Sequence, residues 1–296
     1  MADELKRIVL RYTADQCQNG GVTSTPVQGL YFIRRTTSSE LEHTLRRPLV
    51  CLVLQGRKVV TIGSGMASYA AGDTMIVTGN VPMASRISEA SIVDPYLGLA
   101  LDLDTAVVSD LVLSAPEVHP PQAAIDTGED LRDALHRLVR LLDRPESLSV
   151  LKESLIREIH HWLLLGPQGP AVRSLGLPDS HTRRIARAVA LLRADHSRPA
   201  QIERLAEAAG MSRSAFHHHF RAVTSLSPLQ FQKHLRLMEA RRLILSKGKK
   251  MSEVAFEVGY GSVSQFSREY ARMYGQPPLM DKRAAADRQR ASGEGD

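Results

Sequence analysis

The 296-residue chain has only two cysteines, few aromatic residues and no long apolar run. Cys17 and Cys51 cannot build a disulfide framework, which favours a reducing compartment. No apolar stretch reaches the roughly 20 residues that a membrane-spanning helix needs. Residues 1–11 carry charges of both signs, unlike a secretory signal. These absences argue against secreted and membrane classes and predict a globular protein of the bacterial cytoplasm that needs no membrane partner.

Basic residues gather in the C-terminal part of the chain. From His181 onward there are 21 basic and 11 acidic residues, whereas the part before it has 17 basic and 21 acidic residues. A polyanion is attracted to a basic surface and repelled by an acidic one. The charge therefore predicts that only the C-terminal part meets nucleic acid.

That C-terminal part contains a repeat with a period of about fifty residues. The first copy carries Ala206, Gly210, Ser212, Phe216, Phe220, Ser225 and Pro228. The second copy carries Ala255, Gly259, Ser262, Phe266, Tyr270, Gly275 and Pro278. A glycine turn followed by a serine-capped helix with aromatic residues at i and i+4 is typical of a helix-turn-helix. The repeat predicts two such units in an all-helical domain, with helices at 181–195, 201–209, 212–223, 228–246, 251–258 and 262–274.

Each serine-capped helix has a polar face opposite its aromatic residues, and such a face can enter the major groove of DNA. Side chains expected to contact bases are Arg213, Ser214, His217, His218, Val263, Ser264, Ser267 and Arg268. Those expected to contact phosphates are Ser212, Arg221, Ser262 and Arg272. The helix at 228–246 would be about 28 Å long, close to the ~34 Å spacing of successive major grooves. One chain is therefore predicted to bind two adjacent grooves.

The N-terminal half has a different pattern, with short apolar runs separated by turn residues. Strands are predicted at 31–35, 49–55, 58–62, 74–78, 84–87 and 97–103, which indicates a sandwich or a small barrel. An amphipathic helix is predicted within residues 1–20, before these strands. Helical periodicity returns after the strands, at 127–165. The fold class is therefore α+β in the first domain and all-α in the second.

A row of leucines marks the first helix of the 127–165 segment. Leu131, Leu135, Leu138 and Leu142 recur at helical spacing. Such a row either forms a homodimer contact or packs against the barrel, and we predict the dimer. The predicted domains are 1–166, with the barrel at about 26–115, and 181–280. Residues 167–180 are predicted to be a linker, and residues 281–296 a flexible tail.

The C-terminal motifs resemble those of the AraC family of bacterial transcription regulators. The resemblance rests on residues 210–216, on Ser227 and Pro228, on the 236–243 core of the connecting helix and on residues 258–270. It implies promoter DNA and RNA polymerase as partners, with the more sequence-specific contacts from the first recognition helix. One departure is Ser225, where the family usually has glycine, and a slightly strained turn is expected there.

Residues 26–115 resemble the N-terminal domain of one AraC subgroup. The matching motifs lie at 48–58, 69–73, 81–82 and 89–97. The resemblance implies a cupin-like barrel that binds a small effector, and regulation of nearby metabolic genes, such as those of alcohol or aldehyde metabolism. The predicted function is thus an effector-responsive, sequence-specific activator that is not an enzyme and needs no cofactor.

The alternative function is a cupin-type enzyme fused to a DNA-binding domain. Cupin metal sites use a His-x-His pair, which this chain lacks, because its barrel region holds only His43 and His119 lies beyond it. We expect His43 to lie at the surface, with effector contact as the other possibility. The run His217, His218 and His219 cannot converge on one ion, since successive helix residues point about 100° apart. Cys51 is expected in the core, and Cys17 is either unreactive or a sensor thiol.

Overall fold

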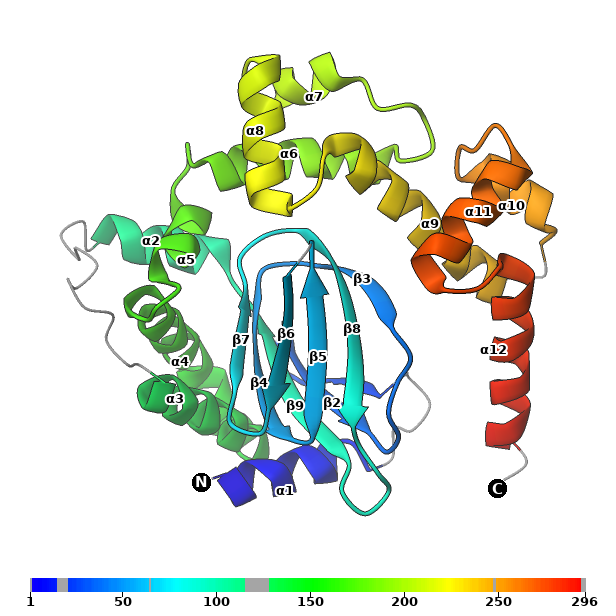
Figure 1. The fold of residues 1–296 in the computed structure, drawn as a ribbon. Helices are drawn as coiled ribbons and strands as arrows, with labels where there is room; N and C mark the ends of the chain where they lie inside the picture. The colour runs from blue at the N-terminus through cyan, green and yellow to red at the C-terminus, as the bar shows by residue number, and fades with distance from the viewer. Residues whose placement is uncertain (1, 15–20, 64, 115–127, 247–248, 294–296) are drawn as a thin grey trace. The chain divides into compact units, whose positions relative to one another are not determined.

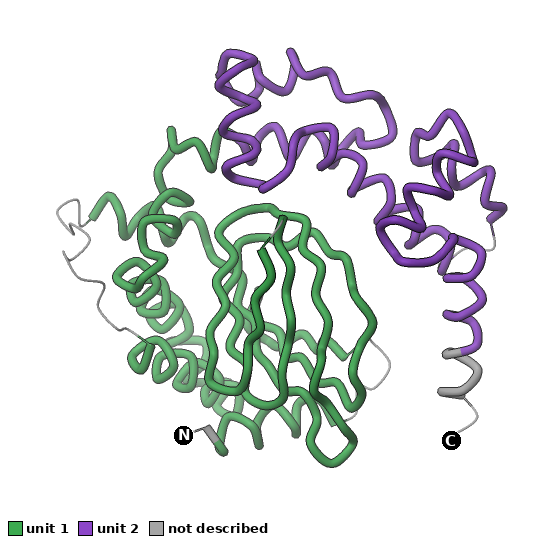
Figure 2. Tube along the Cα trace, in the orientation of Figure 1, with its two compact units in different colours: residues 1–184 green, residues 185–296 purple. Residues whose placement is uncertain are grey.

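The computed structural model describes residues 2–14, 21–63, 65–114, 128–246 and 249–293 (Figure 1). The chain divides into two compact units, residues 1–184 and residues 185–296 (Figure 2). Within the described ranges, strands occur only in the first unit, and the second is entirely helical. The predicted fold class, a β-rich N-terminal domain followed by an all-α domain, is confirmed. No described helix is long and apolar enough to span a membrane.

The first unit contains two antiparallel sheets. One has the strand order β1-β2-β9-β4-β7 and the other β3-β8-β5-β6. The strands are β1 (Val22–Ser24), β2 (Leu30–Arg35), β3 (Glu42–Arg46), β4 (Leu49–Gln55), β5 (Arg57–Ile62), β6 (Gly65–Ala70), β7 (Thr74–Val77), β8 (Val81–Glu89) and β9 (Tyr96–Asp102). All six strands predicted from the sequence are present, and β1, β3 and β6 are additional.

Apolar side chains from both sheets form a shared core. Leu49, Cys51 and Ala100 from the first sheet pack in one cluster with Val60 and Met83 from the second. No described strand of one sheet pairs with a strand of the other, so the unit is a two-sheet sandwich, one of the two arrangements that the strand spacing predicted, and the cupin-like barrel is not closed. Closure fails at edges formed by short, half-exposed strands such as β3, which has no fully buried residue.

Helices cover the other face of the first sheet. They are α1 (Ala2–Tyr12), α2 (Thr105–Ser114), α3 (Gly128–Arg140), α4 (Pro145–Leu165) and α5 (Gly169–Gly176), with a 3-10 turn at Leu141–Asp143. Their apolar residues join those of β2, β4 and β9 in one large cluster. The helices predicted at 127–165 are therefore α3 and α4, and they belong to this layer.

The leucine row does not form the predicted dimer contact. Leu131 and Leu142 are each 5 % exposed, and Leu135 and Leu138 are 0 % exposed, within the core of their own unit. The prediction was wrong because an apolar row has the same spacing whether it packs on its own chain or on a partner. A charge introduced at Leu135 would disrupt this core rather than separate two subunits.

Residues 167–180, predicted as a linker, instead contain α5. Val172 and Leu175 of this helix are buried. Gly176 lies so close to α2 that a Cβ there would be 2.8 Å from the backbone of Val108. The glycines and prolines of this segment therefore begin a helix and allow close packing, and α5 belongs to the first unit.

The second unit follows the predicted helices to within about a residue at most ends. It consists of α6 (His181–Ala194), which crosses the boundary between the units, and then α7 (Ile202–Ala208), α8 (Arg213–Thr224), α9 (Pro228–Ser246), α10 (Met251–Glu257), α11 (Val263–Tyr274) and α12 (Pro278–Gly293). The predicted flexible tail at 281–296 is wrong over most of its length, because α12 continues to Gly293 and Asp281 is fully buried.

Candidate nucleic-acid interface

The first helix-turn-helix consists of α7 and α8. Gly210 turns the chain with a positive φ of 60°, a conformation that glycine adopts at little cost. The hydroxyl of Ser212 then caps α8 by accepting a hydrogen bond from the amide of Ala215 at 3.3 Å. Phe216 and Phe220 are fully buried, with ring centroids 5.3 Å apart in edge-to-face contact. The cap and the aromatic pair fix which face of α8 remains outside.

That outer face of α8 is exposed over its whole length. The six side chains predicted to contact DNA from this unit are all exposed: Ser212, Arg213, Ser214, His217, His218 and Arg221. Arg213 forms an ion pair with Glu203 of α7 at 3.2 Å, with both side chains mostly exposed. Exposed pairs of this kind contribute at most about 1 kcal/mol, so Arg213 can exchange this partner for another anion.

The three consecutive histidines do not form a metal site. His219 is half-buried, whereas His217 and His218 are exposed. The rings of His218 and His219 lie at 81° to each other. Nowhere among the described residues do three or more metal-ligating side chains cluster.

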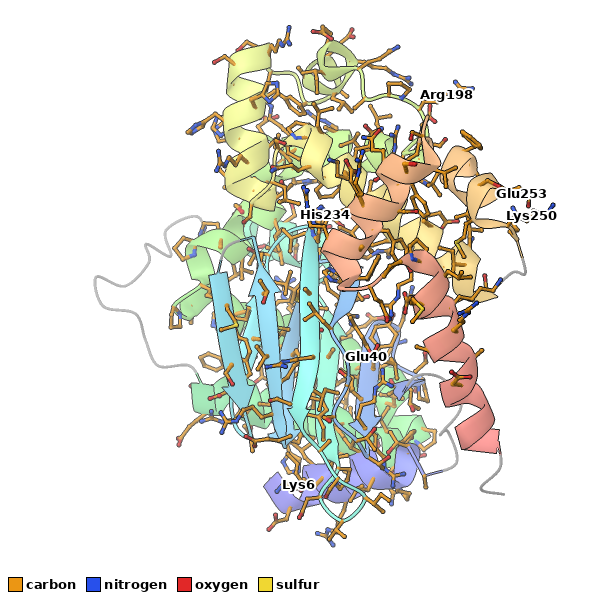
Figure 3. All side chains as sticks on the ribbon, turned by 45° about the vertical axis from the view of Figure 1, so that its right-hand side comes forward. Lys6, Glu40, Arg198, His234, Lys250 and Glu253 are labelled. Atoms are coloured by element: carbon orange, nitrogen blue, oxygen red, sulfur yellow. The ribbon has the colours of Figure 1, made fainter. Side chains whose placement is uncertain are left out.

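The second helix-turn-helix, α10 and α11, repeats this arrangement. Gly259 has a φ of 90°, and Ser262 accepts a hydrogen bond from the amide of Gln265 at 3.4 Å. Phe266 and Tyr270 are fully buried. At the start of α10 the Glu253 carboxylate accepts a hydrogen bond from the amide of Lys250, and the two residues lie together at that helix end (Figure 3).

The outer face of α11 matches the prediction less completely than that of α8. Ser262, Ser264, Arg268 and Arg272 are exposed, and Ser267 is half-buried. Val263 packs against the core of its own unit, so its side chain offers only part of its surface to DNA. The DNA contacts of both helices stay predictions, because exposure is necessary for contact but does not establish it.

The helix α9 connects the two helix-turn-helix units and has the predicted length. It has 19 residues, which corresponds to about 28 Å. In the ribbon, α7 and α8 lie at one end of α9 and α10 and α11 at the other (Figure 1). Two capped helices with exposed polar faces thus lie at the two ends of a helix whose length is close to one turn of DNA.

Two polar networks inside the second unit carry no signal in the sequence. In the first, Arg236 and Gln232 of α9 donate hydrogen bonds to backbone carbonyls of the α6–α7 loop. In the second, the buried Asp281 accepts hydrogen bonds from Arg241 at 2.8 Å and from the Tyr270 hydroxyl at 2.6 Å. Both join segments far apart in the sequence, so local spacing could not reveal them.

The turn at the end of α8 has the strain that the sequence predicted. Ser225 is in the left-handed region with φ 61° and ψ 6°, and no other non-glycine residue among those described has a positive φ. Its counterpart Gly275 has φ 76° at the end of α11. The two turns therefore have the same geometry with different residues.

The remaining predicted residues lie in the first unit. Cys51 is 2 % exposed, and burial raises the pKa of its thiol, which confirms a core position. His43 is half-buried on β3 and not the surface residue that was expected. Cys17 and His119 fall outside the described residues.

Family comparisons match both parts of the chain. Residues 26–171 match the family described as AraC-type transcriptional regulator N-terminus. Residues 205–283 match a helix-turn-helix domain family. The two matches divide the chain near the boundary between the structural units.

Individual relatives agree with these matches. A putative AraC-like transcription regulator of Streptomyces lividans is 30 % identical over 166 residues, covering 55 % of this chain and 54 % of the relative. The virulence regulon transcriptional activator VirF of Yersinia enterocolitica is 26 % identical over 153 residues, covering 50 % and 54 %. The chain thus spans about half the length of these curated relatives.

One solved structure resembles most of the fold. ToxT from Vibrio cholerae, solved with an unsaturated fatty acid bound, aligns with a TM-score of 0.50. The alignment covers 84 % of this chain and 92 % of ToxT, with 10 % identity. At this identity the likeness extends to the fold alone.

Proposed function

Because the chain belongs to the AraC family of transcription regulators, we propose that it binds promoter DNA sequence-specifically through its second unit. The observation that carries the proposal is the pair of capped helices, α8 and α11, exposed at the two ends of α9. Two recognition helices at this separation fit two successive major grooves on one face of the duplex.

On each of the two helices, we expect some side chains to contact bases and others to contact the DNA backbone. Arg213 at the start of α8 and His217 in its second turn present donors that suit base edges. Arg221 and Arg272 lie near the ends of their helices, where they reach phosphates. Each phosphate contact lowers the slope of log K against log salt by about 0.9.

The test is binding of the full chain to double-stranded DNA. We expect selection from random duplexes to enrich one sequence, and affinity for it to fall steeply as salt rises. A fragment that contains only the second unit should begin near residue 178. A fragment that begins at residue 171 would carry most of α5 without α2, the helix against which α5 packs. Salt-insensitive binding, or no enriched sequence, would contradict the proposal.

We propose further that the first unit binds a small effector between its two sheets. Lys58 is 8 % exposed, and burial lowers the pKa of its ammonium. The Tyr96 hydroxyl and the Thr44 hydroxyl are also buried without a hydrogen-bond partner there. Two unpartnered hydroxyls and a buried lysine in one interior are costly, and a polar, anionic ligand would stabilise all three.

Position in the sheets supports a common location for these groups. Lys58 is paired with Ile87, and Thr44 with Met83, so their side chains share the inter-sheet face with those core residues. Tyr96 packs with Val53 and Ile87 from the two sheets. The measurement is a thermal-shift screen of small carboxylates against their uncharged amides, in which Lys58→Met should abolish any stabilisation.

The regulatory details remain part of the proposal. We propose activation of nearby metabolic genes, such as those of alcohol or aldehyde metabolism, through contact with RNA polymerase in a bacterial cytoplasm, and no enzymatic activity. A homodimer stays a proposal, now on the outer face of α4, where Val150 is 73 % and Leu151 47 % exposed. Light scattering of the wild-type chain at micromolar concentration measures the subunit number.

A further inference from the structure

The two helix-turn-helix units are joined by a second connection besides α9. Arg236 lies near the middle of α9 and is half-buried. Its Nε donates to the carbonyl of His196 at 2.8 Å and its Nη2 to the carbonyl of Ser197 at 2.9 Å, both in the loop between α6 and α7. Its Nη1 donates to the carbonyl of Gly259 at 2.9 Å, in the turn between α10 and α11. One guanidinium thus binds the loop before the first helix-turn-helix and the turn inside the second.

We propose that Arg236 fixes the distance and rotation between the two recognition helices, and so sets the spacing of the two DNA half-sites that the protein accepts. This inference rests on the proposed DNA binding and adds a positioning residue to it. Arg236 acts through the backbone of the two units, since all three of its hydrogen bonds go to carbonyl groups.

The loop and the turn pack together closely at this point. A Cβ placed on Gly259 would lie 1.9 Å from the carbonyl oxygen of Ser197. Only a residue without a side chain permits this approach, and the φ of 90° also favours glycine. The loop before the first helix-turn-helix and the turn of the second therefore contact each other through backbone, in addition to the connection through α9.

A neighbouring glutamine holds the loop in place for Arg236. Gln232, one turn earlier on α9, is 5 % exposed. Its amide donates to the carbonyls of His196 and Arg198, and its Oε1 accepts from the amide of Ala200 at 3.3 Å. Arg198, labelled in Figure 3, lies in this loop. The loop is thus fastened to α9 before Arg236 links it to Gly259.

The chemistry suits a permanent contact. Burial lowers the pKa of the Arg236 guanidinium, but an arginine stays charged at any physiological pH. Its three carbonyl acceptors replace the water lost on burial, and the ring of Tyr260 lies 6.0 Å from its central carbon. Lysine would keep the charge but cannot present three donors in a planar fork. Bending at α9 would have to break these bonds.

DNA converts this rigidity into a spacing preference. Inserting one base pair between two half-sites moves them by about 3.4 Å and rotates one by about 35° relative to the other. If Arg236 holds the two helix-turn-helix units rigidly, the protein must distort itself or the DNA to bind both shifted half-sites. If α9 alone joins the units, bending of α9 can bring them onto the shifted half-sites. Loss of Arg236 should therefore reduce discrimination between spacings more than it reduces affinity for the best site.

The first experiment uses no DNA, so that it is independent of the proposed function. Spin labels are placed at the exposed positions Ala222 of α8 and Leu279 of α12 in a Cys17→Ser background, and the distance distribution is measured by pulsed dipolar spectroscopy. We expect Arg236→Gln and Arg236→Lys to broaden the distribution, and Arg242→Gln, an exposed arginine on the same helix, to leave it unchanged. An unchanged distribution in both Arg236 variants overturns the inference.

The second experiment measures binding of the same full-length variants to the selected site and to sites with one base pair added or removed. We expect the wild type to lose about tenfold on the altered sites, about 1.4 kcal/mol, and the Arg236 variants to lose about threefold or less. Equal discrimination in all chains would overturn the inference, while a wild type that binds no duplex would overturn only the DNA-binding proposal. Circular dichroism confirms that each variant is folded, and Gln232→Leu provides a variant that loosens the same loop without touching Arg236.

Discussion

The two helix-turn-helix units share one plan but are stabilised differently. Both use a glycine turn, a serine cap and a buried aromatic pair. In the first unit the second aromatic residue of the pair is Phe220, which packs edge-to-face on Phe231 of α9 with ring centroids 5.5 Å apart. The second has Tyr270 where the first has Phe220. Tyr270 therefore adds a hydroxyl to the core of the second helix-turn-helix unit.

A buried hydroxyl needs a hydrogen-bond partner, and in the second unit the partner is a carboxylate. The Tyr270 hydroxyl donates to Asp281, which is fully buried. The charge of Asp281 is balanced by two hydrogen bonds from Arg241, and Gln276 donates a further one at 3.2 Å. The guanidinium of Arg241 in turn lies 4.7 Å from the centre of the Tyr274 ring. The hydroxyl thus explains why α12 is bound to its unit.

The largest effect should come from removing this carboxylate. Asp281→Ala leaves the guanidinium of Arg241 and the hydroxyl of Tyr270 without their partner, and breaking a buried pair from one side costs about 3–5 kcal/mol. Urea unfolding measures the loss, and hydrogen exchange should place it in α10–α12 rather than in α7 and α8. Asp287→Ala, on an exposed position of the same helix, is the control. Equal losses for both variants would contradict the role given to Asp281.

The same carboxylate predicts how the two units differ in acid. Burial opposes ionisation of Asp281, but hydrogen bonds from Arg241 and Tyr270 outweigh it and lower its pKa below the ordinary value. A lowered pKa contributes stability that is present above the ordinary carboxyl pKa of about 3.9 and is lost as pH falls through the lowered value. Below about pH 4 the second helix-turn-helix unit of the wild type should therefore lose stability. The Asp281→Ala variant should lack this component of the pH dependence.

A moderate effect should distinguish the side chains that contact bases from those that contact phosphates. Arg213→Ala, His217→Ala or His218→Ala on α8 should cost about 1–3 kcal/mol on the selected site and little on scrambled DNA. Arg221→Ala and Arg272→Ala should weaken binding to both duplexes equally, because phosphates carry no sequence. Competition binding with the two duplexes distinguishes these results. Uniform losses in all five variants would remove the division of roles between base and phosphate contacts.

The repeat explains how much of the second unit could be predicted. A cap, a turn and an aromatic pair are set by residues within about ten positions of each other, so each helix was placed from local spacing alone. The hydrogen bonds of Arg236 and the Arg241–Asp281 pair span 23 to 40 residues, the Tyr270–Asp281 hydrogen bond spans 11, and none has a periodicity to reveal it. The helix α12 was missed for the same reason, because the partners of Asp281 lie on α9, on α11 and in the turn before α12.

In the first unit the missed strands share a location. Three of the four sheet edges are β1, β3 and β6, the strands that the sequence did not predict, whereas the fourth edge, β7, was predicted. Edge strands are half exposed and carry few apolar residues, so they lack the alternation that identifies a strand. In β6, Gly65–Ser68 are all exposed. The leucine row of α3 led to a different error. Its strong periodicity correctly predicted the helix, but it did not indicate what the helix packs against.

The smallest effect should come from the residue that ends each recognition helix. Ser225 and Gly275 occupy the same left-handed geometry, and serine pays roughly 1 kcal/mol there while glycine pays little. Ser225→Gly should therefore stabilise the first helix-turn-helix unit. The net gain should be about 0.5 kcal/mol, because the greater conformational entropy of glycine in the unfolded chain offsets part of the relieved strain. Gly275→Ser should destabilise the second by about 1 kcal/mol through the backbone alone, because a Cβ there would meet no atom within 4 Å. Urea unfolding of the two variants and of the double variant measures both values, which should add because the turns share no contact. If Ser225→Gly is destabilising, the serine side chain makes a compensating contact, and the two turns are not equivalent.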